Sequence, residues 1–525
     1  MRKYEVLIFI TGAATLALEV LASRIMTPYF GVSLYIWAGI LSITLTFLAV
    51  GYGWGGRQSA SRNRRELETG FLALPLLSAG AIVLAAALFP VLFPALSQID
   101  LVLGSFIGAS VLLALPLIAL SAMNPLLIGL QRTANKAGDA GAGRVFFIST
   151  VGSVAGVLLT AFVFIPAFTN FTSILLLALL LCALAAIYTL DADGLARGAK
   201  KALLLGSAAA GLVAVLLLAG KDGYLKAVAA GSDNTTVFEK EAEFGSVFGN
   251  IKVLVARPAD GEAPAQRMFI QDGLIQNRTD MQHGSISLYT YALWALSRAA
   301  APKAQRALVL GLGAGILPRN LRDHGIAVTA VDINADVLAA ASGHFGFDAT
   351  GIDVQIADAR TFVRRCTGRY DVMVVDLFLG DNVPDYLLTR EFFADAAACL
   401  TDKGALVMNA FFDEEDDTVN RRLLATVGAA FPQTIEYAIP SGNRLIVATA
   451  GATQLAPAVV AELPAHLSGF VRMLIPSGRP VTPARLAGAE PVSDGKNLFS
   501  VLFAAANMRE RQRMAGQLPP WTLVN

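Results

Sequence analysis

Three aspartates end three predicted strands in the second half of the chain, near a glycine-rich loop. Asp332 closes the run AVTAVD, Asp358 closes DVQIAD and Asp376 closes YDVMVVD. Carboxylates in such places can bind ribose hydroxyls or an exocyclic amine, or take a proton from a nucleophile. Each of them alone is equally well a turn residue or a helix cap. Three such aspartates around one glycine loop favour a nucleoside site.

The glycine loop itself is GLGAG, in which Gly311, Gly313 and Gly315 follow the apolar run ALVL and precede a predicted helix. Glycines there let backbone N–H groups approach a ligand beside the positive end of the helix. Asp332 lies 21 residues after Gly311, a spacing that suits an acid on the ribose hydroxyls. The glycines are not followed by Lys-Ser/Thr, which argues against a phosphate-binding loop. We therefore expect an adenosine ligand such as S-adenosylmethionine or a derivative, with Asp358 on its exocyclic amine.

The elements that position these residues alternate from Arg306 onward. Short strands rich in β-branched residues are separated by predicted helices, which is typical of an open, mostly parallel sheet covered on both faces. Ligands of such sheets bind beyond the carboxyl ends of the strands, where the aspartates lie. The preceding run from Thr235 to Gln276 has the pattern of a small antiparallel sheet.

The first half of the chain has a different composition. The whole chain is 55% hydrophobic and 15% charged, and residues 1–222 hold only 14 Lys/Arg and 9 Asp/Glu. Seven apolar stretches there approach the length needed to cross a bilayer as a helix. They cover about 4–23, 34–54, 70–96, 101–130, 145–168, 171–190 and 203–220. We predict a transmembrane helical bundle over 1–222, a small β-subdomain with a linking helix over 231–300, a Rossmann-like nucleoside-binding domain over 301–455 and a helical extension over 456–525.

The charge of the chain bears on its binding partners, and its cysteines bear on metal sites and disulfides. The net charge of +1 is too mild to indicate a nucleic-acid surface, so we expect a lipid bilayer and small molecules as partners. The three cysteines form no CxxC pattern, which predicts neither a zinc site nor a disulfide framework. Cys182 and Cys366 are expected to be plain thiols, and no metal is expected.

Orientation follows from basic residues, which gather at the N-terminus and after the second, fourth and sixth stretches. They are Arg2, Lys3, Arg57, Arg62, Arg64, Arg65, Arg132, Lys136, Arg144, Arg197, Lys200 and Lys201. This pattern places the N-terminus inside, and seven true spans would then place the second half outside. Since S-adenosylmethionine is a cytosolic metabolite, we expect instead that the 203–220 stretch is interfacial or re-entrant. The protein is then integral to the inner or plasma membrane, with its catalytic domain in the cytoplasm.

The run from about 236 to 450 resembles the spermidine synthase (polyamine aminopropyltransferase) family. It carries the family's DGxxQ element as DGLIQ, ending at Gln276, and VPDYLLTREFF resembles a downstream family motif. The first two apolar stretches are similar to membrane proteins in which helices are fused to such a domain. The resemblance implies that Asp332 holds the ribose, Asp358 with Ala359 the adenine, and Gly311 to Gly315 the tail of the sulfonium ligand. It also implies that Gln276 lines the reacting centre, that Asp376 orients and deprotonates the attacking amine, and that a homodimer is possible.

The sequence departs from the family in its acids. Ala314 stands where the family's glycine loop has Asp, and Leu379 stands where its Asp-Ser-Ser-Asp loop has the second acid. The family's Tyr-His-Glu-like element is missing, with Gln282 to Ser285 in that neighbourhood. A diamine such as putrescine carries two charges that need carboxylates, so its recognition is doubtful. The carboxylate of intact S-adenosylmethionine becomes easier to accept, with assistance from Arg319.

Three hypotheses compete. The leading one is a membrane-integral aminopropyltransferase-like enzyme that uses S-adenosylmethionine or its decarboxylated form and releases methylthioadenosine. Its acceptor is an amine or the ligand's own tail. The second is a methyltransferase on the same fold. The third is a membrane transporter or sensor with a non-catalytic nucleoside-binding domain; few polar groups besides Glu19 and Asn124 lie in the apolar stretches, which makes transport secondary.

Overall fold

The computed structural model divides the chain into two compact units. It describes residues 2–132, 139–229, 235–378, 383–410, 412–440, 442–451, 455–456, 463 and 465–525. The first unit is Met1–Ser232 together with Arg511–Asn525, and the second is Asp233–Glu510. The predicted C-terminal extension 456–525 is thus divided at Arg511, because its last residues cluster with the helical unit.

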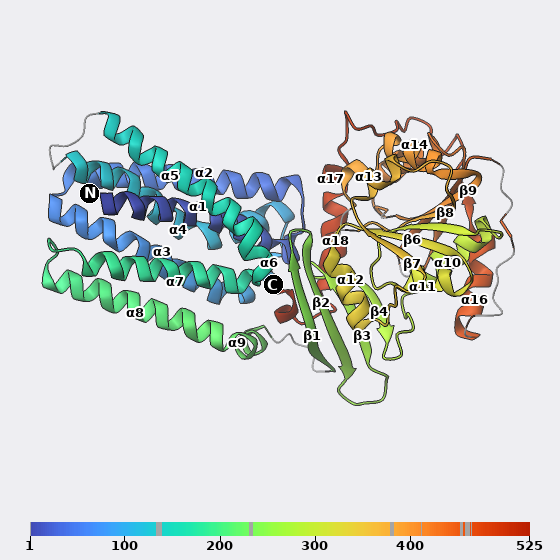
Figure 1. Cartoon of the computed structure of the whole chain (residues 1–525), viewed down its shortest axis with the longest axis horizontal. Helices are drawn as coiled ribbons and strands as arrows, with labels where there is room; N and C mark the ends of the chain where they lie inside the picture. Colours follow the sequence, from blue (N-terminus) through green and yellow to red (C-terminus); the bar gives the residue numbers. More distant parts are fainter. Residues whose placement is uncertain are drawn as a thin grey trace. The chain divides into compact units, whose positions relative to one another are not determined.

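Long helices that lie side by side build the first unit (Figure 1). Their bounds are α1 Arg2–Phe30, α2 Leu34–Ser61, α3 Arg64–Leu96, α4 Leu101–Arg132, α5 Asp139–Leu159, α7 Asn170–Leu190 and α8 Arg197–Ala219. A π-helical turn, Thr160–Phe164, and the short α6, Ile165–Ala167, continue α5, while α9, Lys221–Val228, follows α8. Seven helices in the described part of the chain are long and apolar enough to cross a membrane, and each predicted stretch falls in one of them. The last, α8, has 23 residues and qualifies like the others.

Close approach of α1 and α5 shows how this bundle packs. A Cβ atom added to Gly152 would lie 2.1 Å from the carbonyl oxygen of Phe9, and one added to Gly156 would lie 2.1 Å from that of Ala13. Only glycine fits at such backbone contacts, which are typical of helix pairs in lipid.

The second unit contains two sheets. The antiparallel sheet has the order β1-β2-β3-β4, with bounds Thr236–Ser246, Gly249–Pro258, Gln266–Gln271 and Leu274–Asp280. Asp272 and Gly273 join β3 to β4 with φ of 48° and 81°, the left-handed geometry of a tight hairpin turn. The Asp-Gly of the DGLIQ element therefore has a local structural reason. The predicted antiparallel region extends four residues further than Gln276, to Asp280.

The larger sheet has the order β12-β10-β11-β9-β8-β5-β6-β7. Its strands are β5 Arg306–Leu310, β6 Ala327–Asp332, β7 Ile352–Ile356, β8 Tyr370–Val375, β9 Leu400–Ala410, β10 Gln433–Ala438, β11 Arg444–Thr449 and β12 Arg479–Pro480. The pairs β6–β7, β5–β6, β5–β8 and β8–β9 are parallel, and the pairs of β11 with β9 and β10 are antiparallel. This is the predicted open, mostly parallel α/β sheet.

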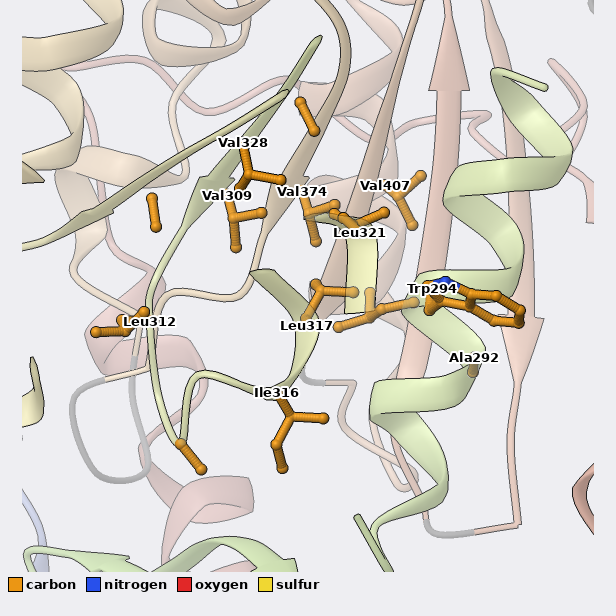
Figure 2. Packing of buried hydrophobic residues seen from close by; sticks show 14 of the residues in the cluster. Ala292, Trp294, Val309, Leu312, Ile316, Leu317, Leu321, Val328, Val374 and Val407 are labelled. Carbon is orange, nitrogen blue, oxygen red and sulfur yellow. The ribbon is translucent and has the colours of Figure 1, made fainter. Parts of the chain in front are cut away.

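Neighbouring residues of each strand point to opposite sides of this sheet, so both of its faces carry apolar side chains. Helices cover both faces. Val309, Val328, Val374 and Val407 belong to one buried cluster, where they share the core with Trp294 and other helical residues (Figure 2). A second cluster on the other face gathers the alternate strand positions. The helices of the unit are α10 Leu288–Ala300, α11 Ile316–Asp323, α12 Ala335–His344, α13 Ala359–Arg364, α14 Arg390–Cys399, α15 Asp417–Gly428, α16 Ala465–Leu474, α17 Phe499–Leu502 and α18 Ala504–Ala515.

The cysteines differ from the prediction. Cys366, after α13, and Cys399, at the end of α14, form a disulfide whose Cα atoms lie 4.9 Å apart, so Cys366 is not a plain thiol. Their separation of 33 residues gave no sign of the pairing, which depends on α13 and α14 packing together. Cys182 is a buried free cysteine, as predicted.

Candidate active site

The glycine loop connects β5 to α11 at the carboxyl edge of the parallel strands. Gly311 has a φ of 95°, and a Cβ atom there would lie 2.1 Å from the carbonyl oxygen of Asp376. Glycine is therefore required for the loop to pass the end of β8. Around Gly313, with a φ of 51°, no atom of the described residues lies within 4 Å of a Cβ position. The loop thus has open space beside it, as a bound ligand would need.

Asp332 fastens this loop to the end of β6. Its Oδ2 accepts a hydrogen bond from the backbone of Leu312 at 2.9 Å, and its Oδ1 accepts one from Asn334 at 2.9 Å. Burial raises the pKa of Asp332 in spite of these bonds. The carboxylate lies at the end of β6 and has a structural role that the sequence left open, while its role on ribose hydroxyls stays a prediction.

Asp358 caps α13 at the end of β7. Its Oδ1 accepts from the backbone of Thr361 at 2.8 Å, and its Oδ2 accepts from the hydroxyl of Tyr386 at 2.9 Å. Burial opposes ionisation, but these hydrogen bonds hold the pKa of Asp358 below its usual value. Burial and the bond to Asp358 raise the pKa of Tyr386 to about 12. Ala359, buried, begins the helix that Asp358 caps. The helix-cap interpretation and the ligand interpretation of Asp358 are compatible, because each carboxylate oxygen has two lone pairs.

Asp376 directly follows β8, which lies between β9 and β5 in the sheet. In the parallel pairing of β8 with β9, Val375 faces Met408, which brings the next residue, Asn409, beside Asp376. The Nδ2 atom of Asn409 donates to Oδ1 of Asp376 at 2.8 Å. Burial raises the pKa of Asp376 to about 6, and the bond from Asn409 opposes that rise. The group is ionised at neutral pH but close to its titration range, which suits a proton acceptor.

Tyr289 on α10 connects Gln276 to this region. Its hydroxyl donates to the backbone oxygen of Gln276 at 3.0 Å and accepts from Nδ2 of Asn277 at 3.2 Å. Burial and the negative charge of Asp376 raise the pKa of Tyr289 well above its usual value. The phenol of Tyr289 thus contacts the backbone of Gln276 and feels the charge of Asp376. A common site for the side chains of Gln276 and Asp376 stays a prediction.

Three residues at this edge were not predicted. Tyr289, Asn409 and Asn443 form hydrogen bonds around Asp376 and Gln276, the last by donating from Nδ2 to Oδ1 of Asn409 at 3.2 Å. Asn409 could have been found from sequence, since it is a polar residue near the carboxyl end of a predicted strand. Tyr289 and Asn443 carry no such signal.

Of the two residues that replace family acids, only Ala314 lies in the described part of the chain. Ala314 is 2% exposed and belongs to the hydrophobic core. Leu379 lies outside the described residues. Arg319, expected near the ligand tail, donates to the backbone oxygens of His283 at 2.8 Å and Gly346 at 3.2 Å. Its guanidinium therefore holds two loops together, and the expected help with a ligand carboxylate stays a prediction.

No group of three or more His, Cys, Asp or Glu side chains in the part of the chain that the structure describes could hold a metal ion.

Known proteins resemble the second unit in sequence. Residues 287–442 match the family described as "Spermine/spermidine synthase domain". A polyamine aminopropyltransferase of Vibrio vulnificus is 31% identical over 159 residues, which are 28% of this chain and 50% of that protein. The chain thus spans half the length of that relative. The second unit is spermidine synthase-like, as the sequence motifs implied.

Two further matches are a methyltransferase and a solved structure. An N-terminal histidine N-methyltransferase of Emericella nidulans is 38% identical over 108 residues, 20% of this chain and 19% of that protein. The crystal structure of a probable spermidine synthase from Corynebacterium glutamicum matches with a TM-score of 0.39 and 19% identity, covering 50% of this chain and 98% of that one.

Proposed function

We propose that the second unit is a transferase of the polyamine aminopropyltransferase type, acting on S-adenosylmethionine or its decarboxylated form. The observation that carries this proposal is Asp376, a buried carboxylate held by Asn409 beside the glycine loop. Asp332 and Asp358 lie at the ends of the neighbouring strands β6 and β7. These positions fit ribose and adenine, and the open space at Gly313 fits the sulfonium end.

The chemistry follows from charge. An amine attacks the carbon next to the sulfonium, the carbon–sulfur bond breaks, and its electron pair neutralises the sulfur. Methylthioadenosine then leaves as a neutral thioether. The amine is nucleophilic only when it is uncharged, so Asp376 accepts its proton or directs its lone pair. In this proposal Tyr289 and Gln276 orient the amine, and the remaining catalysis is positioning.

The described residues that contact Asp376 suggest a restriction on the acceptor. Asn409, an uncharged residue, donates to Asp376, and Ala314, in place of a family acid, is buried in the apolar core. A diamine would bring a second positive charge that needs its own carboxylate to offset desolvation. We therefore propose an acceptor with a single amine, or the ligand's own carboxylate or amine in an internal cyclisation.

Methyl transfer is the second candidate, favoured by the methyltransferase match. It uses the same nucleoside site but breaks the bond to the methyl carbon and leaves S-adenosylhomocysteine. A transporter or sensor with a non-catalytic domain would form neither product.

We propose that the first unit is integral to a membrane. Its helices carry large apolar side chains on their outer surface, among them Leu45, Phe147 and Phe162, which are 66%, 68% and 72% exposed. Surfaces of this kind need lipid or protein around them. The bundle anchors the enzyme or delivers a substrate, and a homodimer stays a prediction.

The experiment is product identification with the purified full-length protein in detergent. The protein is incubated with either sulfonium nucleoside, with and without a monoamine or putrescine, and the products are separated by chromatography. Methylthioadenosine that is lost in Asp376→Asn supports the proposal, and release without added amine indicates cyclisation. S-adenosylhomocysteine establishes the methyltransferase instead. No methylthioadenosine from either donor refutes the proposal.

A further inference from the structure

Ion pairs join the first turns of several helices at one end of the first unit. The ammonium of Lys3, in α1, lies 2.6 Å from Oδ2 of Asp191, which follows α7. Arg144, in the first turns of α5, lies 2.9 Å from Glu5 of α1. The N-terminus, the start of α5 and the α7–α8 connection therefore share this end, which we call the basic end.

The start of α3 lies at the same end. The hydroxyl of Tyr4 donates to Oε1 of Glu68 at 2.5 Å, which joins the first turns of α1 and α3. The α2–α3 connection thus belongs to the basic end with its cluster of arginines, including Arg62, Arg64 and Arg65. The described basic residues early in α1 and α5, and those around the α2–α3 connection, therefore lie at this end.

The opposite end is tied together by different contacts. Arg511 donates to the backbone oxygen of Pro28, near the end of α1, at 2.9 Å. Gln512 donates to that of Ser97, at the end of α3, at 2.6 Å. The backbone of Phe171, at the start of α7, donates to the oxygen of Asn525 at 2.7 Å.

The chain also leaves the bundle at this end. Lys221, directly after α8, donates to the hydroxyl of Thr169 at 2.7 Å, just before α7. The end of α8 and the returning segment from Arg511 both lie opposite the basic end. Whatever stands between them in the sequence therefore connects to the bundle at the end opposite the N-terminus.

We infer that the second unit works on the non-cytoplasmic side of the membrane. Basic residues in short connections stay in the cytoplasm, so the basic end is inside. Seven helices then place Asp233–Glu510 outside. The other end has few basic residues in its short connections, with Arg24 late in α1 and Lys221 and Lys226 after α8. This inference rests on the proposed membrane insertion, and it reverses the cytoplasmic placement expected from the sequence.

The disulfide is an independent observation that points the same way. Cys366 and Cys399 are 4% and 0% exposed, and both belong to the second unit. Closing the bond removes two protons and two electrons from two thiols, and a thiol–disulfide exchange oxidant must accept them. Such oxidants act outside the cytoplasm, whereas cytosolic thiols are kept reduced. Cys182, in α7, has no partner of this kind.

The placement has a consequence for the proposed reaction. S-adenosylmethionine is a cytosolic metabolite, so a site outside needs a sulfonium nucleoside that is delivered across the bilayer. This supply question is separate from catalysis, because detergent-solubilised protein reaches its substrates from any side. Failure of the topology and failure of the proposed chemistry are therefore distinguishable.

Cysteine labelling in spheroplasts tests the inference. Ala263→Cys places a thiol in an exposed connection between β2 and β3, and Ser61→Cys places one at the exposed end of α2, at the basic end. A membrane-impermeant maleimide is applied before or after permeabilisation. We expect Ala263→Cys to be labelled in intact spheroplasts and Ser61→Cys only after permeabilisation. The reverse pattern, or labelling of both only after permeabilisation, overturns the inference.

A second measurement follows the disulfide in the cell. Cells are quenched with acid, free thiols are blocked, and the protein is reduced and reacted with a maleimide that shifts its mobility on a gel. We expect Cys366 and Cys399 to gain the shift only after reduction, and Cys366→Ser/Cys399→Ser to lack it. Full blocking before reduction means a reducing compartment and contradicts the placement.

Discussion

Asn409 donates from its amide nitrogen to Oδ1 of Asp376 at 2.8 Å, across the boundary between strands β8 and β9. The carboxylate has an uncharged partner and a pKa raised to about 6 by burial. A salt bridge at the same place would lower the pKa and weaken the carboxylate as a base. The pair is therefore suited to a group that must be ionised at neutral pH and still accept a proton.

Removal of this carboxylate is expected to abolish turnover. Asp376→Asn keeps the size of the side chain but cannot accept a proton, so the rate should fall by about 10²- to 10⁴-fold. Methylthioadenosine release per enzyme measures the effect. Asp353→Asn, in an exposed position of β7, is the matched control and should retain the wild-type rate. Equal rates in wild type and Asp376→Asn would remove Asp376 from the mechanism.

The acidic limb of the pH profile should report Asp376. Since its pKa is about 6 and the ionised form is active, kcat/KM should fall as the pH drops through about 6. Asn409→Leu removes the hydrogen bond that lowers this pKa, and the limb should move to higher pH. Asn443→Leu leaves that bond in place and should move the limb less. A limb that stays at one pH in all three proteins would assign it to another group.

The same carboxylate should cost stability near neutral pH. Its pKa lies higher in the folded state than the ordinary value of 3.8, so the folded protein loses stability as the pH rises from about 4 to about 6. At neutral pH, Asp376→Asn should therefore raise the free energy of unfolding by at most about 3 kcal/mol, and the variant should unfold at a higher temperature. The gain should disappear below pH about 4, where Asp376 is protonated in both states. Thermal unfolding at two pH values checks this, and a gain that is equal at both would contradict it.

A second helix cap, Asp416, is a control that separates the proposed nucleoside role of Asp358 from its role as a helix cap. Asp358 caps α13, and Asp416 caps α15 in the same manner, by accepting from the backbone of Thr418 at 2.8 Å. Asp358→Asn and Asp416→Asn should each lose little stability, because asparagine is also a good cap. Only Asp358→Asn should weaken nucleoside binding, by about tenfold or more, since a charged acceptor is lost. Calorimetric titration with methylthioadenosine measures this, and equal affinities in both variants would exclude Asp358 from the site.

The glycine loop offers a pair of substitutions with opposite expectations. Gly311→Ala would drive a methyl group into the carbonyl of Asp376 and should lower stability by more than about 2 kcal/mol. Gly313→Ala meets no atom within 4 Å and should cost only about 1 kcal/mol for its φ of 51°. Its methyl group should nonetheless reduce nucleoside affinity if the ligand occupies the open space. Unfolding and binding measured together on both variants decide this, and unchanged affinity in Gly313→Ala would place the ligand elsewhere.

The sequence alone determined the local features of this protein. These features are the alternation of strands and helices, the aspartates at strand ends and the glycines after β5. Each depends on residues that are close together in the sequence, so a local pattern is enough to predict it. The same holds for the seven apolar stretches, because bilayer thickness sets a helix length. These patterns were enough to predict the α/β sheet, the helical unit and the resemblance to spermidine synthases.

Only the tertiary structure decided which distant residues meet. Tyr289 reaches Gln276 because the segment before α10 folds back along β4, where the backbone of Ile286 donates to that of Arg278. Asn409 reaches Asp376 because β9 pairs with β8 in one register. The Cys366–Cys399 bond and the return of Arg511 to the helical unit likewise join residues far apart in the chain. No local period encodes such contacts, since they follow from the packing of whole elements. For that reason the positions of the aspartates at strand ends could be predicted from sequence, whereas their hydrogen-bond partners could not.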